Sequence, residues 1–521
     1  MPQTHLTALE EAVSRNSSAT VFQVPVIDTV TARVTGYNPI SVGQFAQDVD
    51  AVAKYWVHVL KKAGIPTKSV IAVCLGGLQY IDVVNVYSVA RAGYILHSFS
   101  RLPGIAVVRD LLQKSETKAF IRHTDVKEAL KDIQDIPVYD PVTSTDDLAA
   151  YAGNHLSPMS PQSNENDIAV IFHTSGSISG SPKLVTGTYR WLEALIQKHA
   201  YPLFPKHSRV EVMNWMGNVC HLAQFAGIIR IIQTGGCMVQ MKSHTDEKEI
   251  LAAIDLASLT GLTLVAPLLV KILGRSKADR DVLSSLANLD GKYHNIGRYV
   301  TTGGGRNIFG ITEPGGLMAA SLGTRIDPLN TFRPLNIPGL SHQFVPISTS
   351  REDPHSQLLE LVVLPESIDC PDPKFLDRAD GCFHSGDLWK QVENGYTYCG
   401  RDDDWIKSAN ASRCDTRAIE DNVRQTCGDL VSDCIVVGSM RPSPVLFIES
   451  KTKAGDADLK ESIFKRIEPF HSQRLAHERI TSSDMIVVVP SNTLPRTAKG
   501  TIRRRAVEEV YKETLDQLYD D

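Results

Sequence analysis

Residues 173–183 read His173-Thr-Ser-Gly-Ser-Ile-Ser-Gly-Ser-Pro-Lys183. The segment follows a strand pattern at 168–172 and precedes a helical pattern at 191–199. Glycine lets a backbone approach a ligand closely, and successive N–H groups can form an anion-binding nest. Lys183 adds a point charge, so the segment favours a polyphosphate-binding loop. A flexible surface turn is the alternative, because serine and glycine are common in loops.

Two other glycine-rich motifs do not fit this spacing. The Walker motif needs Gly-Lys followed by Ser or Thr, which this segment lacks. The hydrolase elbow needs a serine midway between two glycines, but Ile178 stands midway between Gly176 and Gly180. The loop is therefore neither of these.

Strand and helix patterns alternate around the loop. Apolar residues recur at helical spacing between Ser41, which can cap the start, and Gly64, which can end the helix. Short apolar runs that read as buried strands lie at 70–74, 94–97, 119–121, 168–172 and 262–266. The alternation predicts an α/β fold of layered subdomains with a largely parallel sheet.

The chain is long enough for more than one domain. Its 521 residues exceed what one hydrophobic core usually organises. Short β runs with Pro-rich turns at 332–366 predict a small β-barrel-like subdomain, and a polar segment opens near residue 402. We therefore predict a large N-terminal domain over 1–401 and a small, mobile α+β domain over 402–521.

Composition argues against several classes of protein. The formal net charge is −5 and no long basic run occurs, so nucleic acid is not an expected partner. The N-terminus lacks the apolar core of a signal peptide, and no apolar run reaches the roughly 18 residues of a membrane span. The nine cysteines form no CxxC pair, which fits reduced thiols. We expect a soluble, cytoplasmic protein.

The loop and four later motifs together resemble the adenylate-forming superfamily of acyl-CoA synthetases, peptide-synthetase adenylation domains and luciferases. The loop is similar to the family's Thr-Ser-Gly-Ser-Thr-Gly-x-Pro-Lys. The later motifs are Asn307-Ile-Phe-Gly-Ile-Thr-Glu313, Gly381-Cys-Phe-His-Ser-Gly-Asp387, Gly400-Arg-Asp-Asp-Asp-Trp-Ile-Lys407 and Leu494-Pro-Arg-Thr-Ala-Lys-Gly-Thr-Ile-Arg503. They keep the family's order over residues 20 to 510, and their details look most like the adenylation domains of fungal synthetase-like proteins.

The resemblance implies an ATP-dependent enzyme that joins a carboxylic acid to AMP and releases pyrophosphate. It implies that Phe309 stacks on adenine, that Thr312 contacts the α-phosphate, and that Glu313 holds Mg²⁺. Asp387 would accept both ribose hydroxyls, and Arg401 would assist there. The further nucleotide-binding residues that it implies are Thr174, Ser175, Gly176, Ser177, Gly180, Lys183, Gly304, Gly305, Asn307 and Gly310.

The resemblance also implies an acid site and a second step. His221 and Gly303 would border the acid, with a satisfied core histidine as the alternative for His221. Asp403 matches the hinge about which the small domain swings. The acceptor of the acyl group would then be coenzyme A, the phosphopantetheine thiol of a separate carrier protein, or an amine.

The C-terminal motif departs from the family pattern. Thr501 stands where the family has its catalytic lysine, and Lys499 lies two residues earlier. In an extended segment this shift keeps the same face and amounts to about 6.6 Å. We therefore predict Lys499 as the catalytic lysine, with Arg503 as the rival. Arg503–Arg505 begin a predicted amphipathic helix, where they serve either a ligand phosphate or a solvated face.

Two further departures lie in the N-terminal part. The loop carries one extra residue at Ile178-Ser179, which loops tolerate. Residues 301–305 run almost directly into Asn307, without the helix that the family has between these strands. The displaced lysine and the missing helix favour an alternative hypothesis, a nucleotide-binding pseudoenzyme with a regulatory or partner-binding role.

Overall fold

The computed structural model describes residues 3–520 other than 100–104, 124–135, 159–163, 175–182, 202–209, 244, 274–287, 293–304, 322–329, 348–356, 377–378, 403–404, 408, 410–412, 453–454, 475, 497–499 and 501. The chain divides into two compact units, which are described separately. The first comprises most of residues 3–398, and the second most of 399–520 together with Gly386–Trp389. The predicted division into 1–401 and 402–521 stays a prediction.

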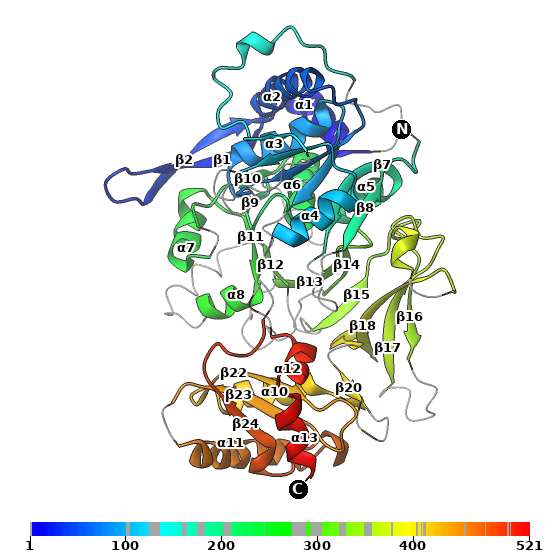
Figure 1. Ribbon diagram of the computed structural model, residues 1–521. Coiled ribbons are helices and arrows are strands. Elements are labelled where there is room, and N and C mark those ends of the chain that lie inside the picture. Colours follow the sequence, from blue (N-terminus) through cyan, green and yellow to red (C-terminus); the bar gives the residue numbers. More distant parts are fainter. Residues whose placement is uncertain are drawn as a thin grey trace. The chain divides into compact units, whose positions relative to one another are not determined.

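The larger sheet has the strand order β16-β17-β18-β19-β15-β14-β13-β12-β11-β9-β10-β1-β2 (Figure 1). It belongs to the first unit except for Gly386–Trp389 of β18 and residues 399–401 of β19. Its strands are β1 (Thr20–Ile27), β2 (Val34–Ser41), β9 (Val212–Asn214), β10 (Cys237–Val239), β11 (Gly261–Val265), β12 (Asn288–Lys292), β13 (Gly305–Ile311), β14 (Gly316–Ser321), β15 (Thr331–Pro334), β16 (His342–Pro346), β17 (Leu358–Val363), β18 (Phe383–Val392) and β19 (Gly395–Arg401). The run from β1 through β10, β9, β11 and β12 to β13 is parallel. Antiparallel strands continue it beyond β13, and these include the β runs predicted at 332–366.

A second sheet of the first unit has the order β6-β5-β3-β4-β7-β8. Its strands are β3 (Val70–Cys74), β4 (Ile95–Phe99), β5 (Ala119–Arg122), β6 (Val138–Tyr139), β7 (Ile168–His173) and β8 (Leu184–Thr188). All neighbours pair in parallel except β7 and β8. The α-helices among the described residues of this unit are α1 (His5–Asn16), α2 (Val42–Lys62), α3 (Tyr80–Arg91), α4 (Ile105–Lys114), α5 (Tyr189–Ala200), α6 (Leu222–Thr234), α7 (Glu247–Leu256) and α8 (Ala266–Leu273). The predicted α/β layers are therefore confirmed.

Helix α2 shows how local sequence sets the element boundaries. The Ser41 hydroxyl accepts a hydrogen bond from the Gln44 N–H at 3.1 Å, which caps the first turn as predicted. Gly64 lies just past the helix with φ +73°, a conformation that glycine adopts without strain. The apolar stripe of α2 is buried, with Phe45 and Trp56 inaccessible to solvent.

Strand β8 was not predicted. It pairs antiparallel with β7, so the hydroxyl-rich loop connects two strands of a hairpin before α5 begins. A Cβ on Gly187 would lie 2.5 Å from the Trp191 ring, so glycine permits the tight corner between β8 and α5. Only Leu184 and Val185 of this strand are apolar, so it lacks the apolar run that marked the other strands.

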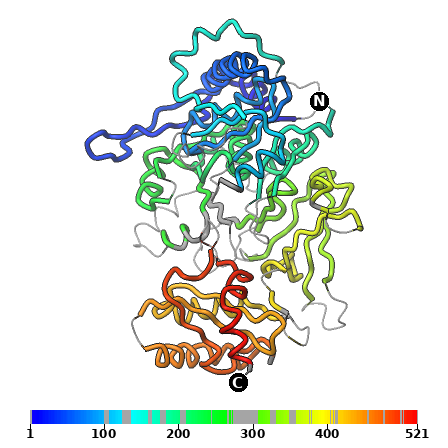
Figure 2. The backbone as a smooth tube through the Cα atoms, in the orientation of Figure 1, coloured from blue at the N-terminus to red at the C-terminus, as the bar shows by residue number. Residues whose placement is uncertain are grey.

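The second unit places helices on both faces of a small sheet. Its elements are β20 (Ile406–Lys407), β21 (Arg413–Cys414), α10 (Thr416–Thr426), β22 (Val431–Val437), β23 (Val445–Ser450), α11 (Asp456–His471), β24 (Ile486–Val489), α12 (Arg504–Val510) and α13 (Lys512–Asp520). Val436 of β22 packs in the core with α10 and α11, while its neighbour Ile435 packs in the core with α12 and α13. This alternation is the two-residue period of a strand. In Figure 2 the C-terminal segment, drawn in red, runs along this unit to the end of the chain.

The amphipathic helix that was predicted to begin at Arg503–Arg505 is two short helices in the structure, α12 and α13. Val507 and Leu515 are buried, but Val510 is 65% exposed. The apolar face therefore breaks at the junction between the helices.

None of the nine cysteines, all of which the structure describes, forms a disulfide. Within the described chain, no helix is both long and apolar enough to cross a bilayer.

Candidate functional site

The ends of the hydroxyl-rich loop are held together at the tip of the β7–β8 hairpin. The Thr174 N–H donates to the Lys183 carbonyl at 2.9 Å, and the Lys183 N–H approaches the Thr174 hydroxyl at 3.4 Å. Lys183 is exposed. The predicted ligands Ser175, Gly176, Ser177 and Gly180 lie outside the described residues, so the anion nest stays a prediction.

The motif Asn307–Glu313 forms the end of β13 and the turn into β14. Asn307 is buried, and its N–H donates to the Ser321 hydroxyl at 2.9 Å. A Cβ on Gly310 would lie 2.6 Å from the Gly316 carbonyl oxygen, so only glycine fits this close strand pair. The partly exposed Phe309 ring lies 5.3 Å from that of Tyr398, at an interplanar angle of 42°.

The turn after β13 packs against helix α5. The Gly315 N–H donates to the Thr312 carbonyl at 3.0 Å, which closes the turn. The Trp191 indole N–H donates to the Glu313 carbonyl at 2.9 Å. The backbone of the turn is thereby held, while the Thr312 and Glu313 side chains remain partly exposed. Trp191 was not singled out from the sequence, because helical periodicity places it on a buried face without naming its partner.

The end of the β13 motif borders a pocket in the first unit. Phe309, Gly310 and Thr312 lie on one wall, and helix α6 supplies much of another. The cavity holds about 110 Å³ of free space. Methionine and aliphatic side chains dominate the lining, among them Met213, Met216, Leu222, Ile231, Met238 and Leu317. The β13 motif therefore meets a largely apolar cavity.

His221 stands at the entrance of helix α6 and lines this pocket. Its ring nitrogen Nδ1 accepts a hydrogen bond from the Ala223 N–H at 3.3 Å, so it caps the helix. It is partly exposed, so it is not a fully buried core histidine. The structure therefore brings His221 to the same cavity as Phe309 and Thr312.

Gly227 of α6 also lines the pocket and was missed by the sequence reasoning. No atom lies within 4 Å of a Cβ built at this position. Glycine inside a helix costs roughly 0.5–1 kcal/mol relative to alanine. A glycine in the middle of an amphipathic helix was the signal that could have found it.

Asp387 and Arg401 meet within the second unit. Asp387 is 4% exposed, and its Oδ2 lies 3.6 Å from Nη1 of Arg401. Gly386 has φ +69°, and a Cβ there would approach Arg401 Nη2 at 3.3 Å. The Gly-Asp pair thus sets the carboxylate beside the guanidinium, although their ribose-binding role stays a prediction.

The predicted Lys499, the hinge Asp403, and Gly303 and Gly304 lie outside the described residues. Gly305 begins β13 and pairs in parallel with Leu289 of β12.

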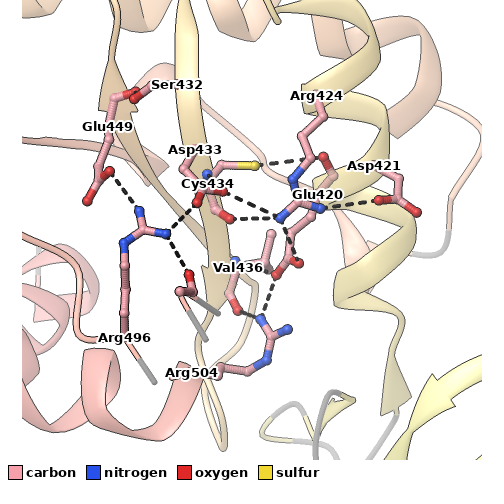
Figure 3. A network of polar contacts seen from close by, with 11 residues as sticks. Glu420, Asp421, Arg424, Ser432, Asp433, Cys434, Val436, Glu449, Arg496 and Arg504 are labelled. Carbon is pink, nitrogen blue, oxygen red and sulfur yellow. Dashed lines mark hydrogen bonds and ion pairs between the residues drawn. The ribbon is translucent and has the colours of Figure 1, made fainter. Parts of the chain in front are cut away.

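The segment on either side of Lys499 is anchored by Arg496 (Figure 3). Arg496 forms an antiparallel bridge with Ile502, and its guanidinium lies 2.7 Å from an oxygen of Asp433 and 2.8 Å from one of Glu449. The guanidinium also donates to the Gly500 carbonyl at 3.0 Å. An arginine inside a predicted catalytic motif was a visible signal, but its acidic partners lie far away in the sequence.

Arg504 has an internal partner. Its Nη1 lies 2.7 Å from Glu420 Oε1 and also donates to the Val436 carbonyl (Figure 3). Its side chain is only 9% exposed, so it does not belong to a solvated face. A cation at the start of a helix interacts unfavourably with the helix dipole, and the negative charge of Glu420 offsets this effect for Arg504 at the start of α12. Arg503 and Arg505 remain exposed.

Two family models match the chain. The family model described as AMP-binding enzyme matches residues 9–328, and the one described as AMP-binding enzyme C-terminal domain matches residues 403–521. The chain is 30% identical to the AMP-binding domain-containing enzyme iboA of Amanita muscaria, over 95% of this chain and 98% of that protein.

Two solved structures share the fold. ATP-bound MatB from Rhodopseudomonas palustris matches with a TM-score of 0.76 at 16% identity, over 99% of this chain and 100% of that one. The anthranilate CoA ligase AuaEII in complex with anthranoyl-AMP matches with a TM-score of 0.75 at 16% identity, over 99% and 98%. The resemblance drawn from the motifs is confirmed: the chain belongs to the AMP-binding enzyme family, the adenylate-forming superfamily.

Proposed function

We propose that the protein uses MgATP to activate a carboxylic acid as its acyl-adenylate. An oxygen of the acid attacks the α-phosphorus in line, and the bond from that phosphorus to the bridging oxygen breaks. Pyrophosphate leaves with the bond electrons. No proton need move in this step, so the residues act by positioning the reactants and offsetting charge.

One observation supports this proposal above the others: the β13 motif and helix α6 enclose the same pocket. Phe309 and Thr312 come from a motif that the family uses for the nucleotide, while Gly227 and Leu222 come from an apolar helix face. An acid in this pocket would therefore lie beside the nucleotide.

The size and lining of the pocket support a single-ring or short aliphatic acid. Its free space of about 110 Å³ is on the scale of engineered cavities of roughly 150 Å³ that admit benzene. Two polar side chains in the lining, Asn214 and Gln224, hold the walls of the pocket through hydrogen bonds to the backbone. Asn214 exchanges two hydrogen bonds with the Thr263 backbone at 3.0 and 2.7 Å, and Gln224 accepts from the Met216 N–H at 2.9 Å.

Glu313 fits the role of a magnesium ligand. It is a partly exposed carboxylate next to Thr312, on a turn whose backbone is fixed. Mg²⁺ prefers oxygen ligands and is usually held by one or two carboxylates together with substrate phosphates. Magnesium would neutralise charge on the phosphates, and Lys499 would add positive charge to the same region.

We further propose that the acyl group passes to an external acceptor. Coenzyme A, the phosphopantetheine thiol of a separate carrier, and an amine are the three acceptors to be tested. Attack by any of them on the adenylate carbonyl would release AMP. Asp403 is the proposed hinge for the domain movement between the two steps.

The first half-reaction is tested by ATP–pyrophosphate exchange with a panel of acids. The panel contains single-ring aryl acids, aryl-keto acids, short aliphatic acids, dicarboxylic acids and amino acids. We expect exchange with at least one member of the first three groups, and its loss in Glu313→Gln. Tight ATP binding by calorimetry without exchange for any acid would refute the proposal and favour the nucleotide-binding alternative.

A further inference from the structure

Helix α5 carries a lysine that is sealed inside the first unit. The Lys198 side chain is fully buried, and its ammonium lies 2.9 Å from Asp369 Oδ2. The same ammonium donates to the Pro314 carbonyl and lies 3.8 Å from the Met318 sulfur. Removing two charges from water is costly, and a buried pair of this kind often adds no net stability over apolar residues of the same size. Stability alone therefore gives no reason for a lysine at this position.

Asp369 is held from several sides. The Ser367 hydroxyl donates to Oδ1 at 2.5 Å, and His342 Nε2 lies 3.0 Å from Oδ2. Burial by itself would raise the pKa of the Asp369 carboxyl, but Lys198, His342 and Ser367 together hold that pKa below its ordinary value. The carboxylate stays ionised, so the lysine has a fixed counter-ion and its ammonium has a fixed location.

Lys198 acts together with Trp191 on two consecutive carbonyls. The Trp191 indole donates to the carbonyl of Glu313, and Lys198 donates to that of Pro314. The two donors are seven residues apart, which is two turns of α5, so they lie on one face of the helix. This face thus holds the backbone of the turn that bears Thr312 and Glu313.

The glycines of the turn show how closely it sits on α5. Gly315 and Gly316 have φ of +80° and +89°. A Cβ on Gly315 would lie 3.3 Å from the Trp191 ring, and one on Gly316 would lie 2.8 Å from the His199 ring. Neither position has room for a larger residue, so a change in the donors on α5 would act directly on the turn.

The same helix is joined to the hydroxyl-rich loop. Thr188, the last residue of β8, caps α5 by accepting the Trp191 N–H at 3.2 Å. The mouth of the loop lies at the other end of β8, where Thr174 and Lys183 are bonded. Strand β8 and helix α5 therefore connect Lys183 to the helix face that holds the Glu313 turn.

We propose that Lys198, with Asp369 as its counter-ion, is a positioning residue that places the Glu313 carboxylate for the magnesium ion of MgATP. The inference rests on the proposed function, because Glu313 is the magnesium ligand only if MgATP binds here. Lys198 itself touches neither nucleotide nor metal.

The test uses Lys198→Met/Asp369→Asn. The double substitution removes both charges at nearly constant volume and leaves an amide for Ser367 and His342, whereas Lys198→Met alone would strand a buried carboxylate. The control is Arg91→Met, which breaks the partly buried Arg91–Asp50 pair of the same unit, 2.7 Å long, away from the turn. ATP affinity is measured by calorimetry with and without Mg²⁺, alongside thermal unfolding.

We expect the gain in ATP affinity on adding Mg²⁺ to fall about tenfold or more in the double variant, the usual scale for losing an outer support of a metal ligand. Magnesium-free ATP affinity should stay at the wild-type value, and Arg91→Met should keep the full gain. The double variant should still unfold cooperatively, at a midpoint lowered by the loss of the hydrogen bond to the buried Pro314 carbonyl. An unchanged gain in the folded double variant, or an equal loss of magnesium-free affinity, would overturn the inference.

The wild type separates this inference from the proposed function. If it shows the magnesium-dependent gain but exchanges pyrophosphate with no acid, acid activation fails, and the variant comparison still decides the role of Lys198. If it binds no MgATP, both proposals fall.

Discussion

Replacing Gly227 with alanine should raise the stability of the protein and lower its activity. The residue lies within α6, and no atom lies within 4 Å of a built Cβ, so a methyl group meets no clash. Removing a glycine from a helix interior raises the free energy of unfolding by roughly 0.5–1 kcal/mol. The methyl group also enters a cavity of about 110 Å³ that the proposed acid must share. One methylene in a fitted apolar pocket is worth about 1–3 kcal/mol, or about 10–200-fold in kcat/KM.

Two measurements check this prediction. Urea unfolding of Gly227→Ala should show the gain in stability, and pyrophosphate exchange with the best acid of the panel should show the loss in kcat/KM. A smaller acid should be affected less, because it leaves room for the methyl group. Gly36→Ala is the control, since its Cβ would also meet open space but β2 does not line the pocket. Unchanged kcat/KM for every acid would refute the assignment of this cavity to the substrate.

Three further predictions concern charge. Lys499→Ala should slow exchange about 10²–10³-fold, the usual cost of losing one group that stabilises developing charge. A larger loss in Arg503→Ala than in Lys499→Ala would instead make the rival the catalytic residue. Arg504→Met removes the nearer of two cations from buried Glu420, which keeps Arg424 at 3.7 Å and the Val436 N–H at 2.9 Å. It should lower the free energy of unfolding of the second unit by about 1–3 kcal/mol in urea. Exposed Arg505→Met should change it by less than about 0.5 kcal/mol, and equal losses in the two variants would contradict the buried pair. Burial lowers the pKa of His5 to about 3. The unfolded chain therefore binds this proton between about pH 6.5 and pH 3 while the folded protein does not, so stability falls on acidification through that window. His5→Phe should remove about 2 kcal/mol of the loss between pH 7 and pH 5, measured by denaturation at both values, and an unchanged loss would mean that His5 is protonated in the fold.

Much of the architecture could be predicted because its signals are local. Ser41 and Gly64 bound α2 through caps that depend on neighbouring backbone groups, and apolar runs marked β3, β4, β5 and β7. The family followed from short motifs in a fixed order. These signals depend on residues close together in the chain, so they survive without knowledge of the fold. Strand β8 was missed because only two of its five residues, Leu184 and Val185, are apolar, and only its pairing with β7 shows that it is a strand.

The support of the candidate site was decided only by tertiary structure. Lys198 and Asp369 are 171 residues apart in the sequence, and Trp191 and Glu313 are 122 apart. Helical periodicity places both donors on an inner face but cannot say which carbonyls they meet. Gly227 likewise reads as a poor helix residue until the cavity beside it is seen. The sequence alone determined the order of chemical groups along the chain, whereas hydrogen bonds of fixed length and packing without gaps determined which of those groups hold one another in place.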